Sequence, residues 1–112
     1  MYPSGKWRAY WEQPIWGRQL MHDLVLRFRD GMVHGEGRDC IGRFTFQGRY
    51  ERQGTIRMVK QYIGRHRVLY EGTYDGEGTI FGRWSIGSLW SGPFAMTREH
   101  APPDPDAPIQ SL

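Results

Sequence analysis

The stretch YEGTYDGEGTIFGRWSIG, residues 70–87, alternates apolar or glycine positions with polar ones on both sides of a glycine-rich turn. The turn DGEG is flanked by two runs in which the even-numbered residues are apolar or glycine: Tyr70, Gly72 and Tyr74, then Ile80, Gly82 and Trp84. We call this shared even or odd numbering the parity of a run. Side chains at every second position of a β-strand point to the same face of a sheet. The stretch therefore predicts a β-hairpin with one apolar face.

The same alternation continues outward along the chain. In GRFTFQGRYE, residues 42–51, Phe44 and Phe46 share one face while Arg43 and Thr45 share the other. Turn signals separate eight such runs, which predict strands near residues 5–12, 20–29, 32–39, 42–52, 54–62, 66–74, 78–85 and 89–98. Short connections favour hairpins, and closure removes the exposed edges of a meander. We therefore expect an all-β fold, an eight-stranded antiparallel up-and-down meander closed into a small barrel.

Parity also assigns individual residues to the inside of this barrel. In LMHDLVLRF, residues 20–28, it places Leu20 and His22 inward and Met21 outward. Most aromatic residues share the inward face, which leaves two interpretations open: a core filled by rings, or an aromatic-walled pocket at one mouth.

Glycine precedes an aromatic residue by two positions in six places: Gly5/Trp7, Gly42/Phe44, Gly48/Tyr50, Gly72/Tyr74, Gly82/Trp84 and Gly92/Phe94. Glycine on the inward face lets a strand bend at a barrel corner, and a neighbouring ring covers the exposed backbone. Gly82 and Trp84 are therefore expected to be structural residues. A larger residue at Gly82 would collide with Trp84 or flatten the bend.

Short motifs resemble the calycin superfamily, which includes lipocalins, fatty-acid-binding proteins and avidins. SGKW, residues 4–7, looks like the Gly-x-Trp opening of their first strand, while FQGRYE and LWSGPF are similar to avidin strands. In lipocalins a basic residue of the last strand packs over that tryptophan. The resemblance implies that Trp7 and Arg98 meet in this way at the closed end of the barrel.

Length and composition predict one small globular domain. The 112 residues fit a single barrel domain over 1–99, followed by a proline-rich extended or disordered tail over 100–112. Cys40 is the single cysteine, so no internal disulfide forms, and we expect a cytoplasmic protein. The N-terminal residues lack the apolar region of a secretion signal, and no segment approaches the roughly 20 apolar residues that span a membrane.

One cation has inward parity in the middle of a strand. Lys60 lies between Met58 and Tyr62 on the apolar face, where a charge needs a partner. Three arrangements stay open: Lys60 reaches water at the barrel end, pairs with Asp39, or anchors a ligand. For the last arrangement, the predicted ligand-binding residues are Lys60, Tyr62, His66, Tyr70 and Trp90.

The residue pattern contains no enzyme signature, so no catalytic residue, cofactor or metal is expected. His34, Glu36, Asp39 and Cys40 form the nearest approach to a metal set, but strand alternation separates them. The arginines lie on the opposite face of the strands from the aromatic rings. This arrangement counts against a surface on which nucleic-acid bases stack on rings beside basic residues. No membrane partner is expected, and a homo-oligomer stays open.

The sequence favours non-catalytic binding of a small hydrophobic or aromatic molecule in the barrel mouth, with an anionic group on that molecule as one option. The alternative function is a protein-interaction or structural barrel with a filled core.

Overall fold

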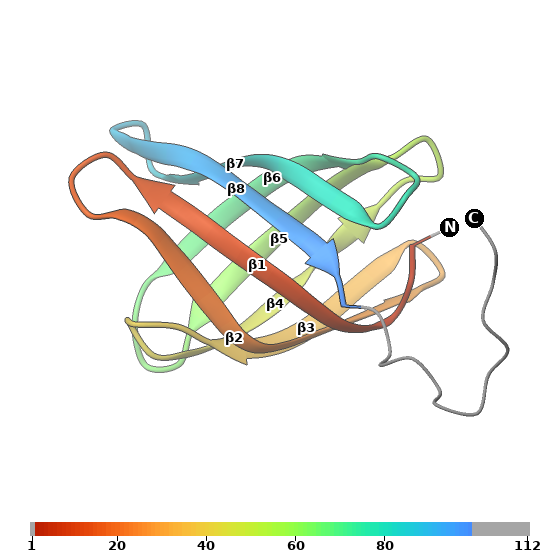
Figure 1. The fold of residues 1–112 in the computed structure, drawn as a ribbon, viewed down its shortest axis with the longest axis horizontal. Coiled ribbons are helices and arrows are strands. Elements are labelled where there is room, and N and C mark those ends of the chain that lie inside the picture. The colour runs from red at the N-terminus through yellow and green to blue at the C-terminus, as the bar shows by residue number, and fades with distance from the viewer. Residues whose placement is uncertain (1, 100–112) are drawn as a thin grey trace, which may run out of the picture.

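The computed structural model describes residues 2–99, which form a closed eight-stranded barrel (Figure 1). The predicted tail over 100–112 lies outside the described residues. Each strand pairs antiparallel with the next, and the last pairs with the first, so the predicted all-β meander is confirmed. The strands are β1 Gly5–Gln13, β2 Gly17–Arg29, β3 Met32–Arg38, β4 Arg43–Tyr50, β5 Thr55–Tyr62, β6 Arg67–Tyr74, β7 Thr79–Ile86 and β8 Trp90–Arg98. Within residues 2–99, no helix has the length and apolar character needed to cross a membrane.

Strand β2 departs from simple alternation, so the predicted inward positions of Leu20 and His22 are wrong. Asp23 adopts a positive φ of 54°, and the register of β2 shifts between His22 and Val25. A bulge of this kind adds one residue and exchanges the faces on its two sides. Met21 is therefore buried, while Leu20 and His22 are exposed.

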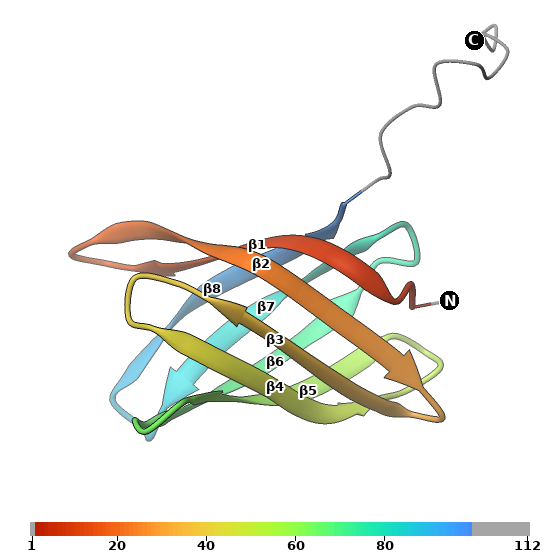
Figure 2. The same cartoon turned by 90° about the horizontal axis from the view of Figure 1, so that it is seen from below.

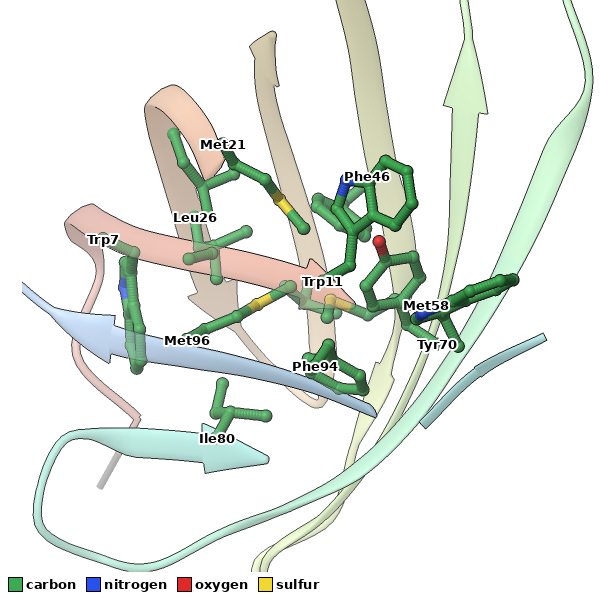
Figure 3. Packing of buried hydrophobic residues seen from close by; sticks show 14 of the residues in the cluster. Trp7, Trp11, Met21, Leu26, Phe46, Met58, Tyr70, Ile80, Phe94 and Met96 are labelled. Atoms are coloured by element: carbon green, nitrogen blue, oxygen red, sulfur yellow. The ribbon is translucent and has the colours of Figure 1, made fainter. Parts of the chain in front are cut away.

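The interior is filled by alternate side chains from the strands. Figure 3 shows Leu26, Met58, Ile80 and Met96 pointing inward from four different strands, and all four are fully buried. Aromatic rings surround this aliphatic centre toward both ends of the barrel.

Glycines inside the strands lie where neighbouring strands approach closely. A Cβ atom at Gly82 would lie 2.5 Å from the Cα atom of Gly72 and closer still to the carbonyl oxygen of Glu71. The expected collision with Trp84 is therefore wrong, because the nearest obstacle is the backbone of β6. The Trp84 ring instead covers Gly92, its partner on β8, where an added Cβ would come within 2.7 Å of Nε1.

The two ends of the barrel carry different loops (Figure 2). The loops over 14–16, 39–42, 63–66 and 87–89 gather at one end, which we call the mouth. The loops over 30–31, 51–54 and 75–78 lie at the other end, where the described chain begins and ends.

Tyr2 closes the end opposite the mouth. Its ring is 4.4 Å from that of Tyr50, 4.6 Å from Tyr74 and 5.1 Å from Phe28, measured between centroids. Its hydroxyl donates to the carbonyl oxygen of Glu51 at 3.1 Å. The ring therefore plugs this end of the barrel.

Candidate functional site

A cavity of about 140 Å³ opens at the mouth of the barrel. Its walls are mainly aromatic and aliphatic, with Gln13 and His66 as polar side chains. The lining residues are Trp11, Gln13, Trp16, Ile41, Tyr62, His66, Val68, Tyr70, Trp84, Ile86 and Trp90.

Strand ends position the rings of this cavity. Trp11 and Trp84 meet edge to face, with centroids 5.9 Å apart, and the Trp84 indole donates from Nε1 to the Glu12 carbonyl at 2.8 Å. At the opposite wall, the Tyr62 ring lies 5.1 Å from His66, centroid to centroid. These contacts orient the walls before any ligand arrives.

A buried ion pair lies next to the cavity. Nζ of Lys60 is 2.7 Å from Oδ2 of Asp39, and both side chains are 0% exposed. Asp39 belongs to the loop between β3 and β4, which brings it over the inward lysine of β5. The sequence had left this pair open as one of three arrangements, and the structure adopts it.

Further donors complete the coordination of the Asp39 carboxylate. Oδ2 accepts from the Tyr62 hydroxyl at 2.7 Å and from Nε1 of Trp11 at 3.2 Å. Oδ1 accepts from the backbone N–H of Ile41 at 2.9 Å. Because hydrogen bonds satisfy both oxygens, the carboxylate is held in one position.

Lys60 is surrounded by rings on its other sides. Its Nζ lies 4.2 Å from the centroid of Phe44 and 4.8 Å from that of Tyr62, distances at which ring faces attract a cation. Nζ also donates to the hydroxyl of Tyr70 at 3.3 Å. The ammonium is thus compensated within the protein.

The pKa values of the pair reflect burial and mutual attraction. Burial lowers the pKa of Lys60 from 10.5 to about 8, although the charge of Asp39 opposes the decrease. Burial alone would raise the pKa of Asp39, but Lys60 and the hydrogen bonds to the carboxylate outweigh it and lower that pKa. The pair is therefore ionised at neutral pH.

Burial also governs the two tyrosines beside the pair. It raises the pKa of Tyr62, and the hydrogen bond to Asp39 adds to this increase. Burial and the charge of Asp39 raise the pKa of Tyr70 well above its usual value. Both hydroxyls therefore keep their protons and act as hydrogen-bonding groups.

Four of the five predicted ligand-binding residues line the cavity: Tyr62, His66, Tyr70 and Trp90. The fifth, Lys60, is not a lining residue and is bound to Asp39. Trp90 was predicted on the inner face; it lines the cavity at the edge of the mouth and is 55% exposed there.

Trp7 and Arg98 lie opposite each other on β1 and β8, at the end away from the mouth. Trp7 is buried and donates from Nε1 to the carbonyl oxygen of Pro3 at 3.0 Å. The residue Arg98 is exposed. Its backbone N–H donates to the carbonyl oxygen of Gly78 at 2.7 Å.

Sequence reasoning did not select Gln13, Trp16, Ile41 or Ile86 as site residues, although all four line the cavity. They lie in the mouth loops or at the strand ends beside them. For Trp16, Ile41 and Ile86 the available clue was a large apolar residue next to a turn signal, since turn residues are usually polar. No sequence signal pointed to Gln13.

The residues weighed for a metal site are not brought together. Glu36 forms an ion pair with Arg27 at 2.8 Å, and Asp39 is committed to Lys60. Across residues 2–99, no cluster of three or more His, Cys, Asp and Glu side chains has a geometry that would hold a metal ion.

The fold and the cavity define a small closed barrel with one plugged and one open end, consistent with a calycin-like fold. Comparisons with protein-family models, with curated proteins and with solved structures found no significant match to this chain. Functional inference therefore rests on the geometry of the mouth.

Proposed function

We propose that this protein binds one small, neutral aromatic molecule in the mouth cavity, without catalysis. The observation that carries the proposal is the cavity itself, with indole rings from three strands on its walls. Eight-stranded barrels are wide enough to hold one small ligand, as lipocalins and streptavidin do. The resemblance of the SGKW and LWSGPF motifs to that group favours the same use here.

Cavity volume limits the size of the ligand. An apolar cavity of about 150 Å³ holds one benzene molecule, and the mouth cavity has about 140 Å³. We therefore infer a ligand with one aromatic ring, stacked among Trp11, Trp84 and Trp90. A longer ligand would extend out of the mouth.

The paired charges at the base of the cavity favour a neutral ligand over an anionic one. Asp39 already compensates the ammonium of Lys60, so no free cation is left at the base of the cavity. Tyr70 accepts a hydrogen bond from Lys60, and among the hydrogen bonds of residues 2–99 its hydroxyl donates none. This proton can be donated to an acceptor on the ligand, for example a carbonyl oxygen.

The test uses toluene, benzaldehyde and benzoate as probes of matched size. A ligand that binds only the folded state raises the melting temperature. At ten times the dissociation constant the stabilisation is about 1.4 kcal/mol, or roughly 5 °C for a domain of this size. We expect a shift with toluene, a larger one with benzaldehyde at equal concentration, and a smaller one with benzoate. Quenching of tryptophan fluorescence gives an independent measure of affinity.

A matched pair of variants locates the binding site. Val68 is buried and lines the cavity, so Val68→Phe places a ring where the ligand would lie. Val59 lies on the outer wall, where Val59→Phe adds the same ring outside the barrel. Val68→Phe should abolish binding and Val59→Phe should leave it unchanged. The proposal would be overturned if the two variants bound the probes equally well, or if neither toluene nor benzaldehyde raised the melting temperature of the unaltered protein.

A further inference from the structure

Large apolar side chains are exposed around the mouth. Ile15, Trp16, Ile63, Leu89 and Trp90, which we call the apolar rim, are between 55% and 87% exposed. They come from three of the four mouth loops and from the first residue of β8. Exposed apolar side chains gathered at one end of a soluble domain mark an interaction surface.

The opposite end of the barrel has no comparable feature among residues 2–99. Its loops consist of charged and polar residues and glycines, with Asp30, Glu51, Asp75 and Glu77 as acids. The three turns at this end are therefore built from polar residues and glycines, whereas three of the four turns at the mouth carry exposed apolar residues. Turn formation alone does not require the apolar rim.

Basic side chains lie beside the apolar rim. Arg43 and Arg67 begin β4 and β6 at the mouth, and Arg65 lies in the loop between β5 and β6. All three are exposed, and within the described chain none forms an ion pair.

The acids near the mouth are already paired. Glu12 pairs with Arg18 at 2.9 Å, and the carboxylate of Asp39 is buried against Lys60. The arginines next to the apolar rim therefore give this end an uncompensated positive charge.

We propose that the apolar rim docks onto the surface of an anionic lipid bilayer. Tryptophan and arginine are suited to the membrane interface, where rings enter the headgroup region and cations meet anionic lipids. Separate loop tips can each insert into a fluid surface without a complementary partner shape. A second copy of this chain is disfavoured, because the arginines of two mouths would face each other.

The expectation of no membrane partner rested on the absence of a membrane-spanning segment, and docking to a membrane surface does not need one. Docking does not require a bound ligand. Trp16 and Trp90 also line the cavity, but both are more than half exposed, so docking can be tested with no ligand in the cavity.

The experiment measures binding of the full chain to vesicles by co-sedimentation. Vesicles of phosphatidylcholine alone are compared with vesicles containing about one third phosphatidylserine. We expect binding to the anionic vesicles, weakened by salt, with a blue shift of tryptophan fluorescence from Trp16 and Trp90. The variant Arg43→Gln/Arg65→Gln/Arg67→Gln should bind roughly 100-fold more weakly, since each basic residue near an anionic surface contributes about a fivefold factor.

Matched apolar variants separate the rim from the barrel wall. Leu89→Ser with Trp16→Ser removes two rim side chains, whereas Leu20→Ser with Phe81→Ser removes two wall side chains that are 56% and 50% exposed. The rim variant should bind at least tenfold more weakly, and the wall variant should bind like the unaltered protein. Absence of binding to anionic vesicles, or equal loss in both variants, would refute the proposal. A dimer in sedimentation that only the rim variant dissociates would assign the rim to a second copy instead.

Discussion

At the scale of single residues, the Asp39–Lys60 pair is the most constrained feature of the interior. Burying two charges is costly, and their attraction compensates only when further hydrogen bonds satisfy both groups. Here the carboxylate accepts from Lys60, Tyr62, Trp11 and the backbone of Ile41. The pair also ties the loop over 39–42 to β5, and so holds one wall of the mouth.

The pair predicts how stability depends on pH. The pKa of Lys60 is about 8 in the folded protein and 10.5 when unperturbed. Between these values the unfolded chain binds more protons, so the free energy of unfolding rises with pH. We expect the contribution of Lys60 to the free energy of unfolding to rise by about 1–2 kcal/mol from pH 7 to about pH 9.5, as measured by urea unfolding.

The double variant Lys60→Met/Asp39→Asn serves as the reference for this measurement. It lacks both titrating groups but keeps the other groups that ionise in the same pH range. The unfolding free energy of the unaltered protein minus that of the variant should increase with pH. Parallel pH profiles, or a difference that decreases, would show that the pKa of Lys60 is not lowered by folding.

At the scale of the strands, close contact between neighbours depends on glycine. Gly72 and Gly82 are directly opposite each other on β6 and β7, and both have extended backbone with negative φ. Neither position has space for a side chain, because an added Cβ would meet the facing strand. The sheet can therefore coil tightly enough to close with eight short strands.

Substitution of Gly82 tests this role. Gly82→Val would force apart β6 and β7, because backbone atoms cannot move aside as a flexible side chain can. We expect a loss of about 3 kcal/mol or more in urea unfolding, at the upper end of the effects of overpacking. Thr79→Val, at the start of the same strand, should change stability by less than about 1 kcal/mol. Similar losses in the two variants would contradict the role of close strand contact.

At the scale of the whole molecule, the barrel is closed at one end and open at the other. Tyr2 fills the closed end and contacts rings from β2, β4 and β6. At the mouth, Trp11 and Trp84 are fixed at the walls by hydrogen bonds to neighbouring loops and strands, and the space between the walls stays open. The closed end therefore contributes stability, and the open end carries the cavity to which the proposed function assigns binding.

This division predicts that Tyr2→Ala lowers stability without affecting the mouth. Loss of a buried aromatic side chain typically costs 3–5 kcal/mol. We expect a loss of about 3 kcal/mol in unfolding free energy, with unchanged binding of toluene under conditions where the variant is folded. Tyr10→Ala on the outer wall, where the ring is only partly buried, should cost about 1 kcal/mol. A loss of toluene binding in Tyr2→Ala would show that the two ends are coupled.

The amino-acid pattern was enough to predict the strands, their order and most of their inward faces. Alternation of apolar and polar residues has the period of a strand, and turn signals between the runs leave only short connections. The inward position of Lys60 followed from the same parity, and the structure places its side chain in the interior. Local pattern was sufficient for these features because each depends on neighbours in the chain.

Features that depend on residues far apart in the chain became visible only in the folded barrel. The bulge at Asp23 exchanges the faces of β2, so that Met21 rather than Leu20 is buried. Asp39 contacts Lys60, which lies 21 positions further along the chain. Tyr2 meets rings of three strands only after the barrel closes. Alternation and turn residues do not predict such contacts, because both report on near neighbours in the chain. Closure of the barrel brings together side chains that are far apart in the sequence and follow no regular spacing.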